Sequence, residues 1–143
     1  MKLESESEFF QRLKTRTLGT FFWERVEPSN ECGFPDSHFV IKNRRGEIQR
    51  PEGTCEFKFA DSKGPPSLKK LLRPSQKAAL IEYHKFGGNR RFYLVYQEGM
   101  VWLYNTDDAY TSLMEDRNQC SAFAYLEESN FCAWLVSCLG GSL

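Results

Sequence analysis

The order of helix-like and strand-like segments most restricts the fold of this 143-residue chain. Residues 5–13 predict a helix, because Ser5 and Glu8 have the spacing of a capping box ahead of apolar positions. Aromatic and β-branched residues then predict three strands, a helix follows, and two more strands meet at a Glu-Gly turn. The ranges are 20–27, 37–42 and 54–60 for the strands, 73–88 for the helix and 91–105 for the last pair. This order predicts an α/β fold with a mixed central sheet flanked by helices.

Length and composition predict one domain over residues 1–143, with helices in the C-terminal part, 105–143. No apolar run is long enough to span a membrane, and the acidic start lacks the apolar segment of a secretory signal. Five cysteines without paired spacing favour reduced thiols. We therefore expect a cytoplasmic protein with no membrane partner.

The net charge of zero hides an uneven distribution along the chain. Residues 42–91 contain thirteen Lys and Arg against five Asp and Glu, and residues 92–143 contain one against seven. A basic segment of this kind is typical of a face that binds a polyanion. The alternative is a solvated surface whose two halves attract each other.

Residues 54–60, TCEFKFA, combine charge with aromatic alternation. Because side chains in a strand alternate between faces, Phe57 and its alternating neighbours can pack under a helix, while Glu56 and Lys58 lie together on the other face. The simplest interpretation is a surface ion pair.

Asp36 follows a Gly-Phe-Pro turn and opens the strand expected to pair with 54–60. It could be an ordinary turn residue. If the strands pair, however, Asp36 and Glu56 come close together, and two convergent carboxylates repel unless a cation lies between them. Mg²⁺ suits such a pair, because it takes few protein oxygens and keeps several waters.

These residues resemble the PD-(D/E)XK nuclease superfamily. Asp36, the Glu56-Phe57-Lys58 triplet and Gln76 on the following helix stand in its order, and the expected elements match its αβββαβ restriction-endonuclease-like core. The Gly-Phe-Pro-Asp stretch is similar to the turn of phage-type and VRR-type members, including Holliday-junction resolvases. The resemblance covers about residues 5–104, the expected nuclease core, and leaves 105–143 as a helical extension.

The resemblance implies roles for these residues. Asp36, Glu56 and the Phe57 carbonyl would bind Mg²⁺, with Mn²⁺ as a substitute. Lys58 would orient or deprotonate the attacking water, and Gln76 would help place the scissile phosphate or a water. The family often adds an acidic residue to the metal site; Glu27 is the first candidate here, and Glu8 is the alternative.

The resemblance also implies that the basic segment, residues 42–91, binds DNA. Contacts of Lys and Arg with phosphates give an affinity that does not depend on base sequence. The expected DNA-binding residues are Lys42, Arg44, Arg45, Lys63, Lys69, Lys70, Arg73 and Lys77. We therefore predict a phage-encoded, Mg²⁺-dependent DNA endonuclease in the host cytoplasm that prefers branched or junction DNA. A homodimer would provide the two active sites needed to cut both strands of a junction. The apolar residues 131–139 would either form the dimer contact or cover the sheet.

Three alternatives remain open at this point. The chain could be a general DNA exonuclease or endonuclease, or a catalytically inactive nucleic-acid-binding module of the same fold. It could also be a small α/β interaction protein in which the motifs are accidental.

Overall fold

Helices and strands follow one another in the predicted order in the computed structural model, which describes residues 3, 5–26, 33–42, 52–61 and 63–140. The elements are α1 (Glu6–Arg16), β1 (Phe21–Arg25), β2 (Ser37–Ile41), β3 (Glu52–Phe59), α2 (Leu68–Leu71), α3 (Pro74–Lys85), β4 (Arg91–Gln97), β5 (Met100–Tyr104), α4 (Thr106–Glu115), β6 (Ala122–Tyr125) and α5 (Phe131–Gly140). The chain is thus an α/β protein, as predicted.

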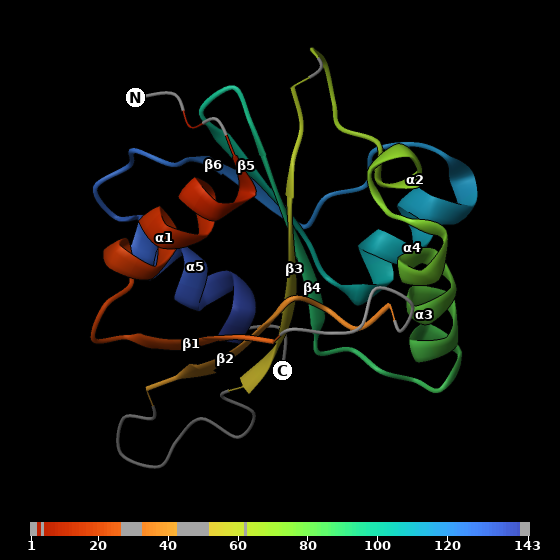
Figure 1. Cartoon of the computed structure of the whole chain (residues 1–143), viewed down its shortest axis with the longest axis horizontal. Helices are drawn as coiled ribbons and strands as arrows, with labels where there is room; N and C mark the ends of the chain where they lie inside the picture. The colour runs from red at the N-terminus through yellow and green to blue at the C-terminus, as the bar shows by residue number, and fades with distance from the viewer. Residues whose placement is uncertain (1–2, 4, 27–32, 43–51, 62, 141–143) are drawn as a thin grey trace.

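The strands form one open sheet in sequence order, β1-β2-β3-β4-β5-β6 (Figure 1). β3 and β4 are parallel, and every other neighbouring pair is antiparallel. The helical segment α2–α3 makes the crossover that parallel neighbours require. The prediction of a mixed sheet flanked by helices is therefore confirmed.

Helices cover both faces of this sheet (Figure 1). α1 and α5 lie on one face, where Phe9, Phe10 and Leu135 join the buried side of β3, including Phe57. α2, α3 and α4 lie on the other face, where Leu80 packs in a second, smaller core. β3 is thus an interior strand with a helical layer over each face.

α1 begins as the sequence predicts. The Ser5 side chain accepts a hydrogen bond from the Glu8 N–H, and two acidic residues in the first turn favour the positive end of the helix dipole. Phe9, Phe10 and Leu13 face the sheet and are buried. The turn between β4 and β5 also forms as expected, with positive φ at Glu98 and Gly99.

The C-terminal segment differs from the expected helical extension. It contains a strand, β6, that pairs with β5 and completes the sheet. Phe131, Leu135 and Leu139 of α5 are buried in the larger core, so the apolar residues of α5 cover the sheet. These three side chains are therefore not available for a dimer contact, and a homodimer stays a prediction.

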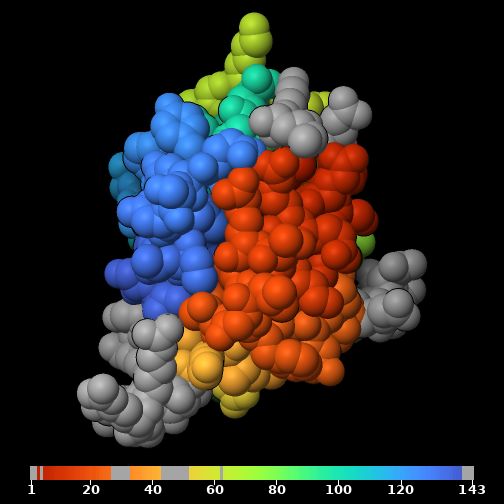
Figure 2. Space-filling view, turned by 90° about the vertical axis from the view of Figure 1, so that its left-hand side faces the viewer, coloured from red at the N-terminus to blue at the C-terminus, as the bar shows by residue number. Residues whose placement is uncertain are grey.

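The two ends of the described chain lie side by side on one face. Figure 2 shows α1 in red next to the C-terminal segment in blue. Arg12 and Arg16 of α1 form ion pairs with Glu127, which follows β6. None of the helices in the described ranges is long and apolar enough to cross a membrane.

Candidate functional site

Asp36 and Glu56 meet at the point where β2 stops pairing with β3. The register pairs Ser37 with Cys55, so Asp36 lies opposite Glu56. The Phe57 N–H donates a long hydrogen bond of 3.4 Å to Asp36 Oδ2, and Ser37 Oγ lies 3.1 Å from Asp36 Oδ1. The two carboxylates expected to converge are therefore neighbours.

The Phe57 carbonyl faces the same side as these carboxylates. The N–H and C=O of one strand residue point to the same neighbouring strand. Because the Phe57 N–H points to Asp36, its carbonyl also points beyond the start of β2. This group can therefore supply a third oxygen beside the two carboxylates.

The Gly-Phe-Pro-Asp turn holds Asp36 against helix α3. Gly33 has a φ of +65°, which favours glycine. A Cβ atom at Gly33 would lie 2.2 Å from the Ser75 carbonyl oxygen and 2.9 Å from the Ala79 Cβ. Pro35 is buried beside this contact. The turn thus needs glycine both for its backbone conformation and for its close approach to α3.

Glu56 and Lys58 are not a surface ion pair. Lys58 Nζ lies 3.6 Å from Glu56 Oε2, and the two residues are only 9% and 4% exposed. A buried charged pair costs desolvation energy that the attraction between the charges offsets only in part. The pair is thus an expensive arrangement, of the kind that is common at functional sites.

Burial and neighbouring negative charge change the acidity of the carboxyl groups. Burial first, and then the charge of Asp36, raise the pKa of Glu56 to about 8, while Lys58 opposes the shift. Burial also raises the pKa of Asp36, although Arg25 and hydrogen bonds act to lower it. The two groups therefore hold a proton near neutral pH unless a cation replaces it.

Helix α1 adds a third carboxyl group, from Glu6. Burial raises the pKa of Glu6, and the charges of Lys58, Asp36, Arg25 and Arg73 all influence it. Glu8, the residue expected on this helix, is exposed. Glu6 precedes Phe9, Phe10 and Leu13 by three, four and seven positions, so helical spacing puts it on the buried face. That spacing was the signal in the sequence, and Glu27, the preferred candidate, lies outside the described residues.

Gln76 is buried at the start of α3 but bonds to the helix itself. Its side-chain oxygen accepts a hydrogen bond of 2.9 Å from the Arg73 N–H, as in a capping box. The oxygen is thus occupied in fixing the first turn. Arg73, at the N-cap of the same helix, is close enough to the site to influence Glu6.

The expected DNA-binding residues do not all lie in one place. Lys63, Lys69, Lys70 and Arg73 are exposed between β3 and α3, and Lys77 is half-buried on α3. Lys69 Nζ lies 3.8 Å from Asp116 Oδ2. Lys42 follows the end of β2 that is distant from Asp36, and Arg44 and Arg45 lie outside the described residues.

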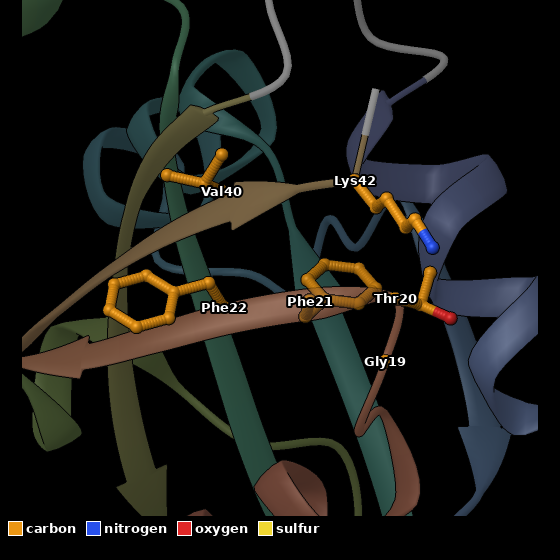
Figure 3. Close-up of a pocket in the computed structure, with 6 residues that line it drawn as sticks. All are labelled: Gly19, Thr20, Phe21, Phe22, Val40 and Lys42. Carbon is orange, nitrogen blue, oxygen red and sulfur yellow. The ribbon is translucent and has the colours of Figure 1, made fainter. Parts of the chain in front are cut away.

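Two hollows in the described surface lie away from these carboxylates. Figure 3 shows one of about 250 Å³, lined by Phe22, Val40 and Lys42 together with Gly19–Phe21. The other, of about 420 Å³, lies on the outer side of α1 beside Gln11 and Thr15. Neither brings titratable groups together as Asp36, Glu56 and Lys58 are brought together. These two hollows of the described surface are therefore weaker candidates for chemistry than the carboxylates.

Comparison with known proteins adds no assignment, because no family model and no curated protein sequence matches the chain. Within the described ranges, no group of three or more His, Cys, Asp or Glu side chains is arranged as a metal site. The carboxylates thus form an open pair with a third acid nearby. They do not form a closed cage.

Proposed function

We propose that the chain is a Mg²⁺-dependent phosphodiesterase that cleaves DNA, with a PD-(D/E)XK-type site and a restriction-endonuclease-like core. One observation carries the proposal. Asp36 and Glu56 are held side by side at a strand end, with the buried Lys58 3.6 Å from Glu56. A buried acid, a half-buried acid and a buried lysine in this arrangement are costly for stability and useful for hydrolysis.

The donor atoms at the site fit Mg²⁺. Asp36, Glu56 and the Phe57 carbonyl would hold the ion, and Glu6 replaces Glu8 as the candidate from the first helix. All are hard oxygen ligands, and Mg²⁺ is commonly bound through one or two carboxylates while it keeps several waters. An open pair of carboxylates is therefore sufficient. When bound, Mg²⁺ lowers the pKa of water and stabilises negative charge on phosphate oxygens.

Lys58 supplies positive charge beside the attacking group. Its amine can orient the water through hydrogen bonds, and its charge stabilises the negative charge that develops on the phosphate. The fixed position near Glu56 means that little reorganisation is needed during the reaction. Gln76 acts in this proposal as a positioning residue, because its oxygen fixes the turn of α3 on which Gly33 packs.

The basic residues between β3 and α3 would hold the DNA backbone. Lys63, Lys69, Lys70 and Arg73 are exposed on the segment that joins the site strand to α3. Backbone contacts recognise shape and charge more than base sequence. We therefore expect the enzyme to select DNA by its structure and to prefer branched or junction substrates. If the protein forms a homodimer, the contact would use a surface other than the buried side of α5.

An inactive nucleic-acid-binding module is the second candidate. It is favoured by the absence, among the described residues, of a three-residue metal group, and by the use of the Gln76 oxygen in helix capping. Such a module would bind DNA with the same salt dependence but would not cut it in Mg²⁺ or Mn²⁺.

Labelled duplex, flap and four-way DNA incubated with the protein and Mg²⁺ tests the proposal. Cleavage should require the metal, should be fastest on branched DNA, and should fall at least about a hundredfold in Asp36→Asn, Glu56→Gln and Lys58→Ala. The two carboxylate variants should also bind Mn²⁺ more weakly, whereas Lys58→Ala should keep most Mn²⁺ binding. Glu52→Gln, an exposed acid on the same strand, is the matched control. Wild-type cleavage by Asp36→Asn would refute the assignment, and DNA binding without metal-dependent cleavage would favour the inactive module.

A further inference from the structure

Arg91, at the start of β4, lies over two aromatic rings. The centre of its guanidinium lies 4.5 Å from the Tyr83 ring centroid and 5.7 Å from that of Phe34. Among the described residues, its buried Nε has no hydrogen-bond partner. The two ring contacts, together with a side-chain hydrogen bond between Arg91 and Tyr93, therefore hold this cation in place.

Tyr83 forms a rigid base for this stack. Its hydroxyl oxygen accepts a hydrogen bond of 2.9 Å from the Arg90 N–H. A Cβ atom at Gly88 would lie 2.4 Å from the Tyr83 ring, so the ring packs directly on the glycine backbone. The position of Tyr83 is thus fixed from two sides.

Phe34 is the outer member of the stack. It is 41% exposed, although both neighbours in sequence are buried and Gly33 packs on α3. It also lies two residues before Asp36. The turn that fixes Asp36 thus also holds an exposed aromatic ring beside a cation, two residues before this carboxylate.

We propose that Phe34 stacks on an unpaired base of the bound strand, so that the base, Phe34, Arg91 and Tyr83 form one column. This inference rests on the proposed function, since it names the part of the DNA that lies next to the cut. Every nucleobase has a face that can stack on an aromatic ring, and such contacts do not depend on sequence. The positive charge of Arg91 suits the approach of a polyanion and strengthens the hold on the Phe34 ring.

The column selects for DNA with unpaired nucleotides beside the scissile phosphate. Bases inside a duplex are stacked on each other, so they reach Phe34 only after unstacking. Flaps, gaps and branch points already contain unpaired or easily unpaired bases. The preference for branched DNA would then arise from access to a base and not from a junction-shaped surface.

The test uses the full chain in Ca²⁺ without Mg²⁺, with an oligonucleotide that carries 2-aminopurine at single positions. Phe34→Ala should weaken binding of single-stranded and flap DNA about 5- to 150-fold and remove the fluorescence change at one position. It should leave blunt-duplex binding within about twofold. Phe34→Tyr keeps the ring and should restore both readouts.

Phe86→Ala is the matched control, because Phe86 is 84% exposed at the end of α3, away from the rings that contact Arg91. Arg91→Lys keeps the charge but loses the planar group, so it should weaken single-strand binding while thermal unfolding shows a folded protein. If Phe34→Ala binds flap DNA as tightly as Phe86→Ala does, the column is overturned and the nuclease proposal stands. If the wild-type protein binds no DNA at all, both are overturned.

Discussion

Gly33 and Ser75 are so close that a Cβ atom on the glycine would lie 2.2 Å from the serine carbonyl oxygen. This contact joins the turn before Asp36 to the first turn of α3. The contact couples the position of the Asp36 carboxylate to helix α3. Its importance can be tested without changing a charged group.

Replacing Gly33 with alanine should therefore damage both stability and metal binding. The positive φ and the close contact together should lower the free energy of unfolding by about 2–5 kcal/mol. Displacement of Asp36 should also weaken Mn²⁺ binding. Urea unfolding and a Mn²⁺ titration measure the two effects.

Gly64→Ala is the control for this change. Gly64 has a φ of +83°, but among the described residues no atom lies within 4 Å of a Cβ built on it. It should cost about 1–2 kcal/mol through backbone strain alone and leave Mn²⁺ binding intact. Equal effects of the two substitutions would show that the contact with Ser75 is unimportant.

A pair of substitutions on α1 separates two neighbouring acids. Glu6→Gln should weaken Mn²⁺ binding severalfold and slow cleavage, because Glu6 is part-buried and close enough to Lys58 and Asp36 for their charges to shift its pKa. Glu8→Gln, on the exposed side of the same turn, should change neither. Isothermal titration with Mn²⁺ measures the difference, and a larger effect at Glu8 would contradict the placement of Glu6 at the site.

The stability of the metal-free protein should fall as pH rises from about 5 to 8. In the unfolded chain Glu56 loses its proton near 4.5, whereas in the folded protein it keeps the proton up to about 8. The folded state therefore binds more protons across this interval, and raising the pH favours unfolding by up to about 1.4 kcal/mol per pH unit. Urea unfolding in EDTA at several pH values gives this slope.

Glu56→Gln removes the group that titrates, so it should abolish most of this pH dependence. Added Mn²⁺ should stabilise the wild-type protein more at pH 8 than at pH 6, because the ion binds the deprotonated carboxylates. The same slope in both proteins would mean that another group causes it.

Binding of duplex DNA to the Lys58→Ala protein should weaken steeply with salt, because bound phosphates release counterions. Replacing both Lys69 and Lys70 with alanine should reduce the slope of log K against log salt by about 2. Lys14→Ala, at the far end of α1 from Glu6, should leave the slope unchanged. Fluorescence anisotropy at several salt concentrations checks this, and an affinity that does not change with salt would mean that the basic segment is merely solvated.

The sequence was informative where the chain follows a local rule. The alternation of side chains in residues 54–60 correctly placed Phe57 on one face of the strand and Glu56 and Lys58 on the other. The expected pairing of this strand with residues 37–42 put Asp36 near Glu56, and the register confirms it. β6 was missed because its four residues form an edge strand whose partner, β5, is fixed only in the folded sheet.

Tertiary features of the site could not be read from local patterns. Burial of Glu56 and Lys58 depends on the helices that cover their face, and the contact of Arg91 with Phe34 and Tyr83 joins three segments distant in sequence. Glu6 is an intermediate case. Helical spacing could have identified it, but the capping box drew attention to Glu8.

The shared layer of α1 and α5 has a consequence for how fast this side of the molecule folds. α1 precedes every strand in the sequence, but the core on its face also includes residues of β6 and α5, which follow the other strands. The ion pair between Arg12 and Glu127, for example, joins residues 115 positions apart. Because such contacts require long loops to close, we expect this layer to form more slowly than the hairpin of β4 and β5.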